Sequence, residues 1–215
     1  MTTPGSAIAY LHEEINPHKT PTVRELGRVD LGTVPADIAA TPDDCWDTAA
    51  DFEANYNKRG ALRDAAHIIF RFCDRRRRPA PCYDLPIWQQ WAPRLMPIMQ
   101  AAVTPYGYAR GFFPRIMLAR LPAGAFIAPH VDGEPSGNRP HKIHVPLLTN
   151  DDTFFFVDQQ RYHFAVGHAY EVNNAARHAA ANSGRSDRVH LIFEYLDYSL
   201  QRFAAPPDAP TANWR

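Results

Sequence analysis

The sequence contains few cysteines and no excess of charge of either sign, and both absences exclude classes of protein. Cys45, Cys73 and Cys82 are its only cysteines. Because they are odd in number and form no CxxC pair, we expect neither a disulfide framework nor a cysteine zinc site. The 23 Lys and Arg residues balance 23 Asp and Glu residues, so no overall field would attract nucleic acid or an anionic membrane. We therefore expect no nucleic-acid partner.

A long apolar run is also missing. The first residues, MTTPGSAIAYLHEEINPHK, contain neither the basic segment nor the apolar segment of a secretory signal. No later run is long enough to cross a bilayer. These features predict a cytoplasmic protein with no membrane partner, which would be a monomer or a homodimer.

One local concentration of charge interrupts this balance. Arg75–Arg78 form a run of four arginines that is followed by PAP. Aromatic residues are not interleaved with the run, as they are on surfaces that bind single-stranded nucleic acid, so a solvated loop is favoured. A local basic patch for an acidic substrate or nucleic acid is the alternative.

The chain length and the composition of both ends indicate one folded domain. A chain of 215 residues suits one domain with a sizeable core better than two domains. Residues 1–24 are polar and aperiodic, which predicts an N-terminal arm. Residues 204–215, AAPPDAPTANWR, are rich in proline and alanine and predict a loose tail. The domain is therefore expected to occupy residues 25–203.

Two helical patterns occur in the first half of the chain. Thr41-Pro42-Asp43-Asp44 has the capping hydroxyl, early proline and acidic residues of a helix start. The helix would end before Gly60 and present one apolar face, formed by Cys45, Ala49, Phe52 and Tyr56. Residues 84–103 carry apolar side chains at steps of four, and Pro93 and Pro97 within them predict two short helices or one bent helix.

The second half has the pattern of a β-rich domain. Short β-like runs alternate with turn residues after Gly107: RIMLARL, AFIAPH, KIHVPLL, TFFFVD, RYHFAV, AYEVNN, HAAAN and RVHLIFEYL. Upstream, HIIFRFC at 67–73 predicts one further strand. Regularly spaced short strands are typical of a sandwich or barrel. We predict an α+β, mainly β fold, a jelly roll backed by the N-terminal helices on one outer face.

Three residues in the β-rich half form a candidate metal site. His130 and Asp132 are one residue apart, so their side chains point the same way in an extended segment. His178, in HAAAN, would complete the facial arrangement of two histidines and one carboxylate that binds non-haem iron(II). On its own, His-x-Asp is more typical of a solvated loop. The signal becomes specific because Arg188 follows His178 after ten residues.

Five segments of the β-rich half resemble those of one enzyme family. PHVDG, PHKIHVPL, AYEVNNAARH, NSG and DRVHLIFEY are similar to segments of the aspartyl/asparaginyl β-hydroxylase-like family, which includes the bacterial cis-proline hydroxylases. The resemblance covers roughly residues 110–198. It implies a cupin-like double-stranded β-helix over these residues, iron(II), 2-oxoglutarate as co-substrate, dioxygen, and hydroxylation of an amino acid.

The resemblance also implies roles for five residues. It makes His130, Asp132 and His178 the iron ligands, and Arg188 the cation that binds the distal carboxylate of 2-oxoglutarate. The planar guanidinium suits this role because it can donate to both carboxylate oxygens. His144, in KIHVPL, matches a family histidine placed near the co-substrate.

Other residues near these segments have less defined roles. Lys142 stands where the family usually has arginine. It is a candidate to contact the co-substrate, and the carboxylate which that arginine serves would be bound differently here. Asn173 and Asn174 precede the distal histidine, and either bond to the co-substrate or cap a turn. Arg115 and Arg120 flank the segment IMLA and are candidates to hold a substrate carboxylate at the mouth of a pocket.

The sequence thus predicts a 2-oxoglutarate-dependent dioxygenase. Its substrate would be an amino acid, or an Asp, Asn or Pro residue of a peptide or protein. A non-catalytic cupin-like module that binds a metal or ligand is one alternative, and it would form no succinate. A metal-dependent cupin isomerase is another, and it would not require Arg188.

Overall fold

The computed structural model describes residues 18–55, 60–73, 82–132 and 140–197. Its helices are α2 (Val34–Ala39), α3 (Ala49–Ala54) and α4 (Trp88–Val103), with 3-10 turns at Asp43–Cys45 and Thr104–Tyr106. None of the described helices is long and apolar enough to cross a membrane. The run Arg75–Arg78, the expected tail 204–215 and most of the expected arm lie outside the described residues.

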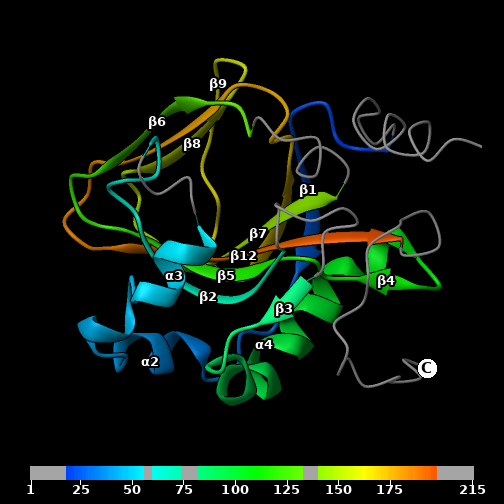
Figure 1. Cartoon of the computed structure of the whole chain (residues 1–215). Coiled ribbons are helices and arrows are strands. Elements are labelled where there is room, and N and C mark those ends of the chain that lie inside the picture. The colour runs from blue at the N-terminus through cyan, green and yellow to red at the C-terminus, as the bar shows by residue number, and fades with distance from the viewer. Residues whose placement is uncertain (1–17, 56–59, 74–81, 133–139, 198–215) are drawn as a thin grey trace, which may run out of the picture.

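The larger of two sheets has eight strands in the order β1-β10-β7-β12-β5-β2-β3, with β4 pairing to the end of β12. Its strands are β1 (Val23–Arg28), β2 (Ala66–Cys73), β3 (Cys82–Asp84), β4 (Gly111–Phe112), β5 (Ile116–Leu121), β7 (His141–Leu148), β10 (His168–Val172) and β12 (Arg188–Asp197). Helices α2, α3 and α4 lie on one side of this sheet (Figure 1).

The smaller sheet lies on the other side of the larger one (Figure 1). Its order is β6-β11-β8-β9, with β6 (Phe126–His130), β8 (Thr153–Val157), β9 (Gln160–Tyr162) and β11 (His178–Asn182). All the strand pairs in both sheets are antiparallel. The predicted jelly roll backed by helices is therefore confirmed.

Strand β12 separates two hydrophobic cores because its side chains alternate between the two faces of the sheet. Val189, Leu191 and Phe193 belong to the core that also contains the apolar face of α4. A second core contains Leu121 and side chains of the smaller sheet such as Phe155. The alternate positions of β12 therefore face the space between the sheets, and they include Arg188, Ile192 and Glu194.

Helix α4 is one continuous helix in spite of its two prolines, so of the two expected arrangements the structure has a single helix and not two short ones. Pro93 and Pro97 are exposed and lie four residues apart, on the side of the helix away from the core. Each proline removes one backbone hydrogen bond, but the carbonyl groups released on this side can bond to water instead.

The predicted helix from Thr41 is interrupted. A 3-10 turn ends at Cys45, and α3 begins as a separate helix after Thr48. The side chain of Thr48 caps this helix in a capping box. Asp47 lies between them with a φ of 57°, and its carboxylate accepts a hydrogen bond from the backbone of β2 at His67 (2.8 Å). Phe52 is 49% exposed, so the predicted apolar face does not form; Tyr56 lies outside the described residues.

The three cysteines are free thiols, as expected. Cys73 and Cys82 are register partners on β2 and β3, and both are buried. The thiol of Cys73 donates to the carbonyl oxygen of Pro114 (3.2 Å). They therefore act as packed side chains in this structure.

Candidate functional site

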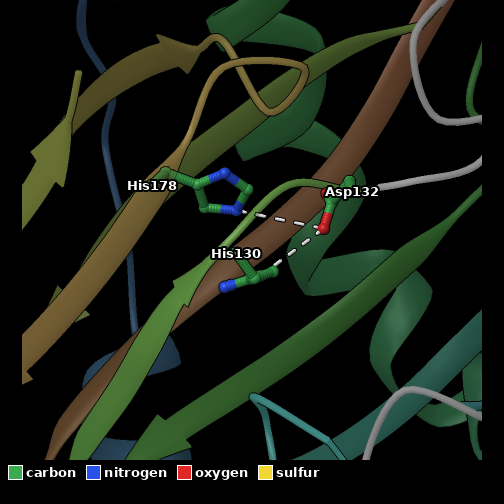
Figure 2. A group of neighbouring side chains, drawn as sticks. All are labelled: His130, Asp132 and His178. Atoms are coloured by element: carbon green, nitrogen blue, oxygen red, sulfur yellow. Dashed lines mark ion pairs between the residues drawn. The ribbon is translucent and has the colours of Figure 1, made fainter.

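His130, Asp132 and His178 converge on one point (Figure 2). His130 ends β6 and His178 begins β11, and the two are register partners across this antiparallel pair. Asp132 lies two residues beyond His130. Its Oδ1 is 3.6 Å from Nε2 of His130 and 3.9 Å from Nε2 of His178. One ligand atom from each of the three residues lies within 4.8 Å of the other two.

Backbone carbonyl groups orient both imidazoles. Nδ1 of His130 is 2.8 Å from the carbonyl oxygen of Ala128, and Nδ1 of His178 is 3.0 Å from that of Ala176. A carbonyl oxygen only accepts, so each Nδ1 carries the proton. Each Nε2 is then left with a lone pair that faces the shared point, as in a histidine that binds a metal.

Asp132 uses its two carboxylate oxygens differently. Oδ2 accepts hydrogen bonds from Nζ of Lys142 (2.6 Å) and from Nδ2 of Asn174 (2.9 Å), whereas Oδ1 faces the imidazoles. Lys142 and Asn174 were both expected beside the co-substrate, and the structure places their polar groups on the metal-site carboxylate. They therefore fix the direction in which Asp132 points.

The charges at the site favour the protonation states that metal binding requires. Burial would raise the pKa of the Asp132 carboxyl, but Lys142 and then His178 outweigh it and hold this pKa well below its usual range. Burial lowers the pKa of His178 to about 4. A carboxylate and a neutral imidazole are the forms in which Asp132 and His178 would coordinate a metal.

Arg188 lies in the same cavity as the three candidate ligands. The cavity has a volume of about 530 Å³ and is lined by all four residues. The Arg188 side chain is buried, and its Nε has no hydrogen-bond partner. Within the described part of the chain it forms no ion pair, and burial lowers its pKa to about 10. A buried cation without an anion is costly, so this position favours an anionic ligand.

His144 also lines the cavity and is the register partner of Ile192 on β12. Its Nδ1 lies 3.4 Å from Nδ1 of His190. Burial, together with the nearby Lys142, keeps the pKa of His144 well below its usual value. The ring therefore stays neutral and is available as a hydrogen-bonding group in the cavity wall.

The two arginines that flank IMLA have different surroundings. Arg115 lines the cavity and is paired with Glu194 (3.0 Å). Arg120 is paired with the exposed Asp43 (2.7 Å) and lies over the ring of Trp46, away from the cavity. Glu194 is not among the residues that the sequence predicts for the site, although it shares the alternating face of β12 with Arg188.

The donor set fits iron(II). Two imidazole nitrogens and one carboxylate oxygen come from one side, and this facial arrangement leaves further coordination positions open. The cation of Arg188 and the open cavity add a place for a carboxylate-bearing co-substrate. The residues present therefore fit both groups.

A solved structure shares the fold of this chain. The chain is similar to an oxidoreductase of the 2OG-Fe(II) oxygenase family from Burkholderia pseudomallei, with 18% identity and a TM-score of 0.51, over 64% of this chain and 70% of that chain. This likeness shows a shared fold. No curated protein sequence matches the chain.

Two further structures cover more of the chain at lower similarity. One is the viral collagen prolyl hydroxylase of Paramecium Bursaria Chlorella virus-1, with 11% identity and a TM-score of 0.48 over 81% of this chain and 94% of that chain. The other is a prolyl-4-hydroxylase from Pseudomonas putida, with 14% identity and a TM-score of 0.43 over 81% and 91%.

The sequence model of one family gives the assignment. The model described as aspartyl/asparaginyl beta-hydroxylase matches residues 86–197. This segment contains the three candidate metal ligands and Arg188, and it spans more than half of the chain. The chain belongs to the aspartyl/asparaginyl β-hydroxylase family.

Proposed function

We propose that this chain hydroxylates an amino acid, free or within a peptide or protein, with iron(II) held by His130, Asp132 and His178 and 2-oxoglutarate held by Arg188. As a family member, the chain is an enzyme that depends on iron(II), 2-oxoglutarate and dioxygen. The proposal adds the residues that hold the metal and the co-substrate, and the class of substrate.

The observation that carries the proposal is the position of Arg188. Its buried guanidinium has no anionic partner among the described residues, and it opens into the same cavity as the candidate ligands. A dicarboxylate that reaches both points would supply the missing anion. The planar fork of arginine suits a terminal carboxylate, and exclusion of water strengthens the pair.

The chain's residues would orient and enclose the reactants. When bound, iron(II) with 2-oxoglutarate and dioxygen supplies the oxidant that converts a substrate C–H bond to C–OH, with succinate and carbon dioxide as the other products. Lys142 and Asn174 hold Asp132 so that Oδ1 faces the two imidazoles. The neutral His144 offers a hydrogen bond in the cavity wall without adding charge, and the apolar side chains around it exclude water.

The test is the anaerobic addition of iron(II) and 2-oxoglutarate to the protein. The measurement is the weak visible charge-transfer band of the chelate. The wild-type protein is expected to develop the band. Arg188→Met should need at least about tenfold more 2-oxoglutarate for the same band, because a hydrogen-bonded charge pair contributes roughly 1.5–3 kcal/mol. This variant is expected to fold, since it removes a buried cation that no described acid balances.

Arg161→Met is the matched control. Arg161 is exposed on β9 and does not line the cavity, so its loss should leave the titration unchanged. If Arg188→Met titrates like the wild type, Arg188 does not bind the co-substrate.

Release of succinate distinguishes the proposed hydroxylase from a non-catalytic binding module and from a cupin isomerase. A metal- or ligand-binding module would release no succinate from 2-oxoglutarate in the presence of oxygen. A cupin isomerase would act without 2-oxoglutarate and would retain its rate in Arg188→Met. Oxygen-dependent succinate formation that requires iron(II) is the expected result.

A further inference from the structure

A buried ion pair lines the cavity away from Arg188. Nη1 of Arg115 is 3.0 Å from Oε1 of Glu194, and the two side chains are only 8% and 5% exposed. The guanidinium also lies over the ring of Phe72, with its Cζ 5.0 Å from the ring centroid. Burial of two charges costs energy that their attraction often does not return. A pair of this kind in a cavity wall therefore points to a role in binding.

Glu194 and Arg188 both line the cavity, and they lie far apart along β12. They are six residues apart on one extended strand and project from the same face, so about 20 Å separates their Cα atoms. Ile192 lies between them, flanked by its register partners His144 and Met117. If the co-substrate carboxylate occupies the Arg188 end, the Glu194 end is left for the substrate.

Charges of alternating sign connect this end with the metal site. Glu194 is the register partner of Lys142, whose Nζ is 2.6 Å from Oδ2 of Asp132. On the other side, the backbone N–H of Glu194 donates to the carbonyl oxygen of Arg115 (3.0 Å). Asp132, Lys142, Glu194 and Arg115 thus form a row with two charges of each sign.

Such a row favours a ligand that also carries one charge of each sign. A ligand with a net charge would add an uncompensated charge to a buried row, which is costly. Lys19 is another cation close to Glu194, but its Nζ donates to the carbonyl oxygen of Pro140 (2.8 Å) and it is not among the described residues that line the cavity.

We propose that Glu194 and Arg115 are specificity-determining residues that bind a small zwitterion, of which a free α-amino acid is the simplest example. Glu194 uses only Oε1 in its pair with Arg115, and Oε2 makes no hydrogen bond within the described residues. Oε2 would accept from the substrate ammonium group, and the guanidinium would donate to the substrate carboxylate. This inference rests on the proposed function, because it assigns the other end of the cavity to 2-oxoglutarate.

The first experiment compares free and blocked amino acids as substrates. Wild-type enzyme with iron(II), 2-oxoglutarate and oxygen is supplied with each of the twenty common L-amino acids, with its N-acetyl derivative and with its carboxamide. At least one free amino acid is expected to stimulate succinate release, and each of its blocked forms to do so at least about tenfold less. Equal stimulation by a blocked form, or none by any free amino acid, overturns the proposal.

The second experiment separates binding from a purely structural role of the pair. For the amino acid found, Glu194→Gln should raise KM at least about tenfold, corresponding to about 1.4 kcal/mol, while the KM for the co-substrate stays within about threefold of the wild-type value. Glu194→Asp should recover part of the loss. A structural role would instead change both KM values, or neither.

Asp84→Asn is the matched control, because it breaks a cross-strand pair between Arg71 and Asp84 (2.8 Å) that lies outside the cavity. Its kinetics should equal those of the wild type. The charge-transfer band distinguishes failure of the proposed function from failure of the zwitterion site alone. A wild-type protein without the band contradicts the proposed function, whereas a protein with the band that does not favour free amino acids contradicts only the zwitterion site.

Discussion

Asp132 depends on side chains from two other parts of the fold. Lys142 is on β7, and Asn174 follows β10, yet both donate to the same carboxylate oxygen. The ligand oxygen is therefore aimed by residues that do not touch the metal position themselves. Partners of this kind commonly change metal affinity by 10- to 100-fold when they are removed.

Lys142→Met is expected to weaken iron(II) binding by about 10- to 100-fold without unfolding the protein. The substitution keeps most of the length of the side chain and leaves Oδ2 of Asp132 with the hydrogen bond from Asn174 alone, so the direction of the carboxylate is less well fixed. Competition with a chelator under anaerobic conditions measures the change. Arg161→Met removes a surface cation instead, and its affinity should match that of the wild type. Equal affinities for all three proteins would contradict the positioning role of Lys142.

The sequence could predict the candidate ligands but not their supports. His130, Asp132, His178 and Arg188 follow recognisable spacings, and the structure brings all four to one cavity. The contact of Lys142 with Asp132 depends on how the larger sheet, which contains β7, faces the smaller sheet, which contains β6, and no local pattern encodes this. Glu194 could have been found, because alternation along a strand places it on the face of Arg188.

Among the elements, helix α4 contains a residue that lowers its stability. Pro93 lies inside the helix on its exposed side. Pro93→Ala restores one backbone hydrogen bond and removes a steric conflict, which together cost about 3 kcal/mol in a helix interior. Alanine also makes the unfolded chain more flexible than proline does, and this lowers the unfolding free energy by roughly 0.4–1 kcal/mol. We expect a net gain in unfolding free energy of about 2 kcal/mol, measured by urea denaturation; a loss of stability would show that the proline fits without cost.

Glu171 joins three strands of the larger sheet. From β10 it accepts hydrogen bonds from His141 on β7 (2.6 Å) and from the backbone of Thr20 (3.2 Å), and it pairs with Arg24 on β1 (2.9 Å). Its side chain is fully buried. Glu171→Gln should lower the unfolding free energy by about 3 kcal/mol at pH 7, because it leaves buried donors without their anion.

This loss should depend on pH. Burial would raise the pKa of Glu171, but His141 outweighs this effect and the folded-state pKa is lowered. A lowered carboxyl pKa stabilises the fold above the unfolded-state pKa, and this contribution disappears as the pH falls through the folded-state pKa. The difference between wild type and Glu171→Gln should therefore shrink from about pH 5 to about pH 3. A constant difference would contradict the charge effect.

Element prediction succeeded where periodicity was strong. Strands such as β5, β7 and β12 lie within one or two residues of their predicted runs. The interval from Thr41 was mispredicted because tertiary contacts of Asp47 with β2 override its local helical pattern. Short edge strands such as β3 and β4 carry too few residues for a pattern and form only beside their partners.

For the whole molecule, the metal should contribute to stability. His130 and Asp132 lie at the end of β6, and His178 lies on β11, so one ion links both strands and the segment beyond them. At a free iron(II) concentration 100 times Kd, binding adds about 2.7 kcal/mol, which raises Tm by roughly 5–10 °C for a domain of this size. Anaerobic calorimetry measures the shift. Asp132→Ala should largely abolish it, and an undiminished shift would place the metal elsewhere.

Strand β12 is hydrogen-bonded on both edges, to β7 and β5, over most of its length. The distance between Arg188 and Glu194 is therefore fixed by the rise per residue of an extended strand. One inserted residue between them would turn Glu194 toward the helices and remove its carboxylate from the cavity. New substrate preferences in this scaffold should thus arise by exchange of side chains along β12, while changes in its length should abolish activity.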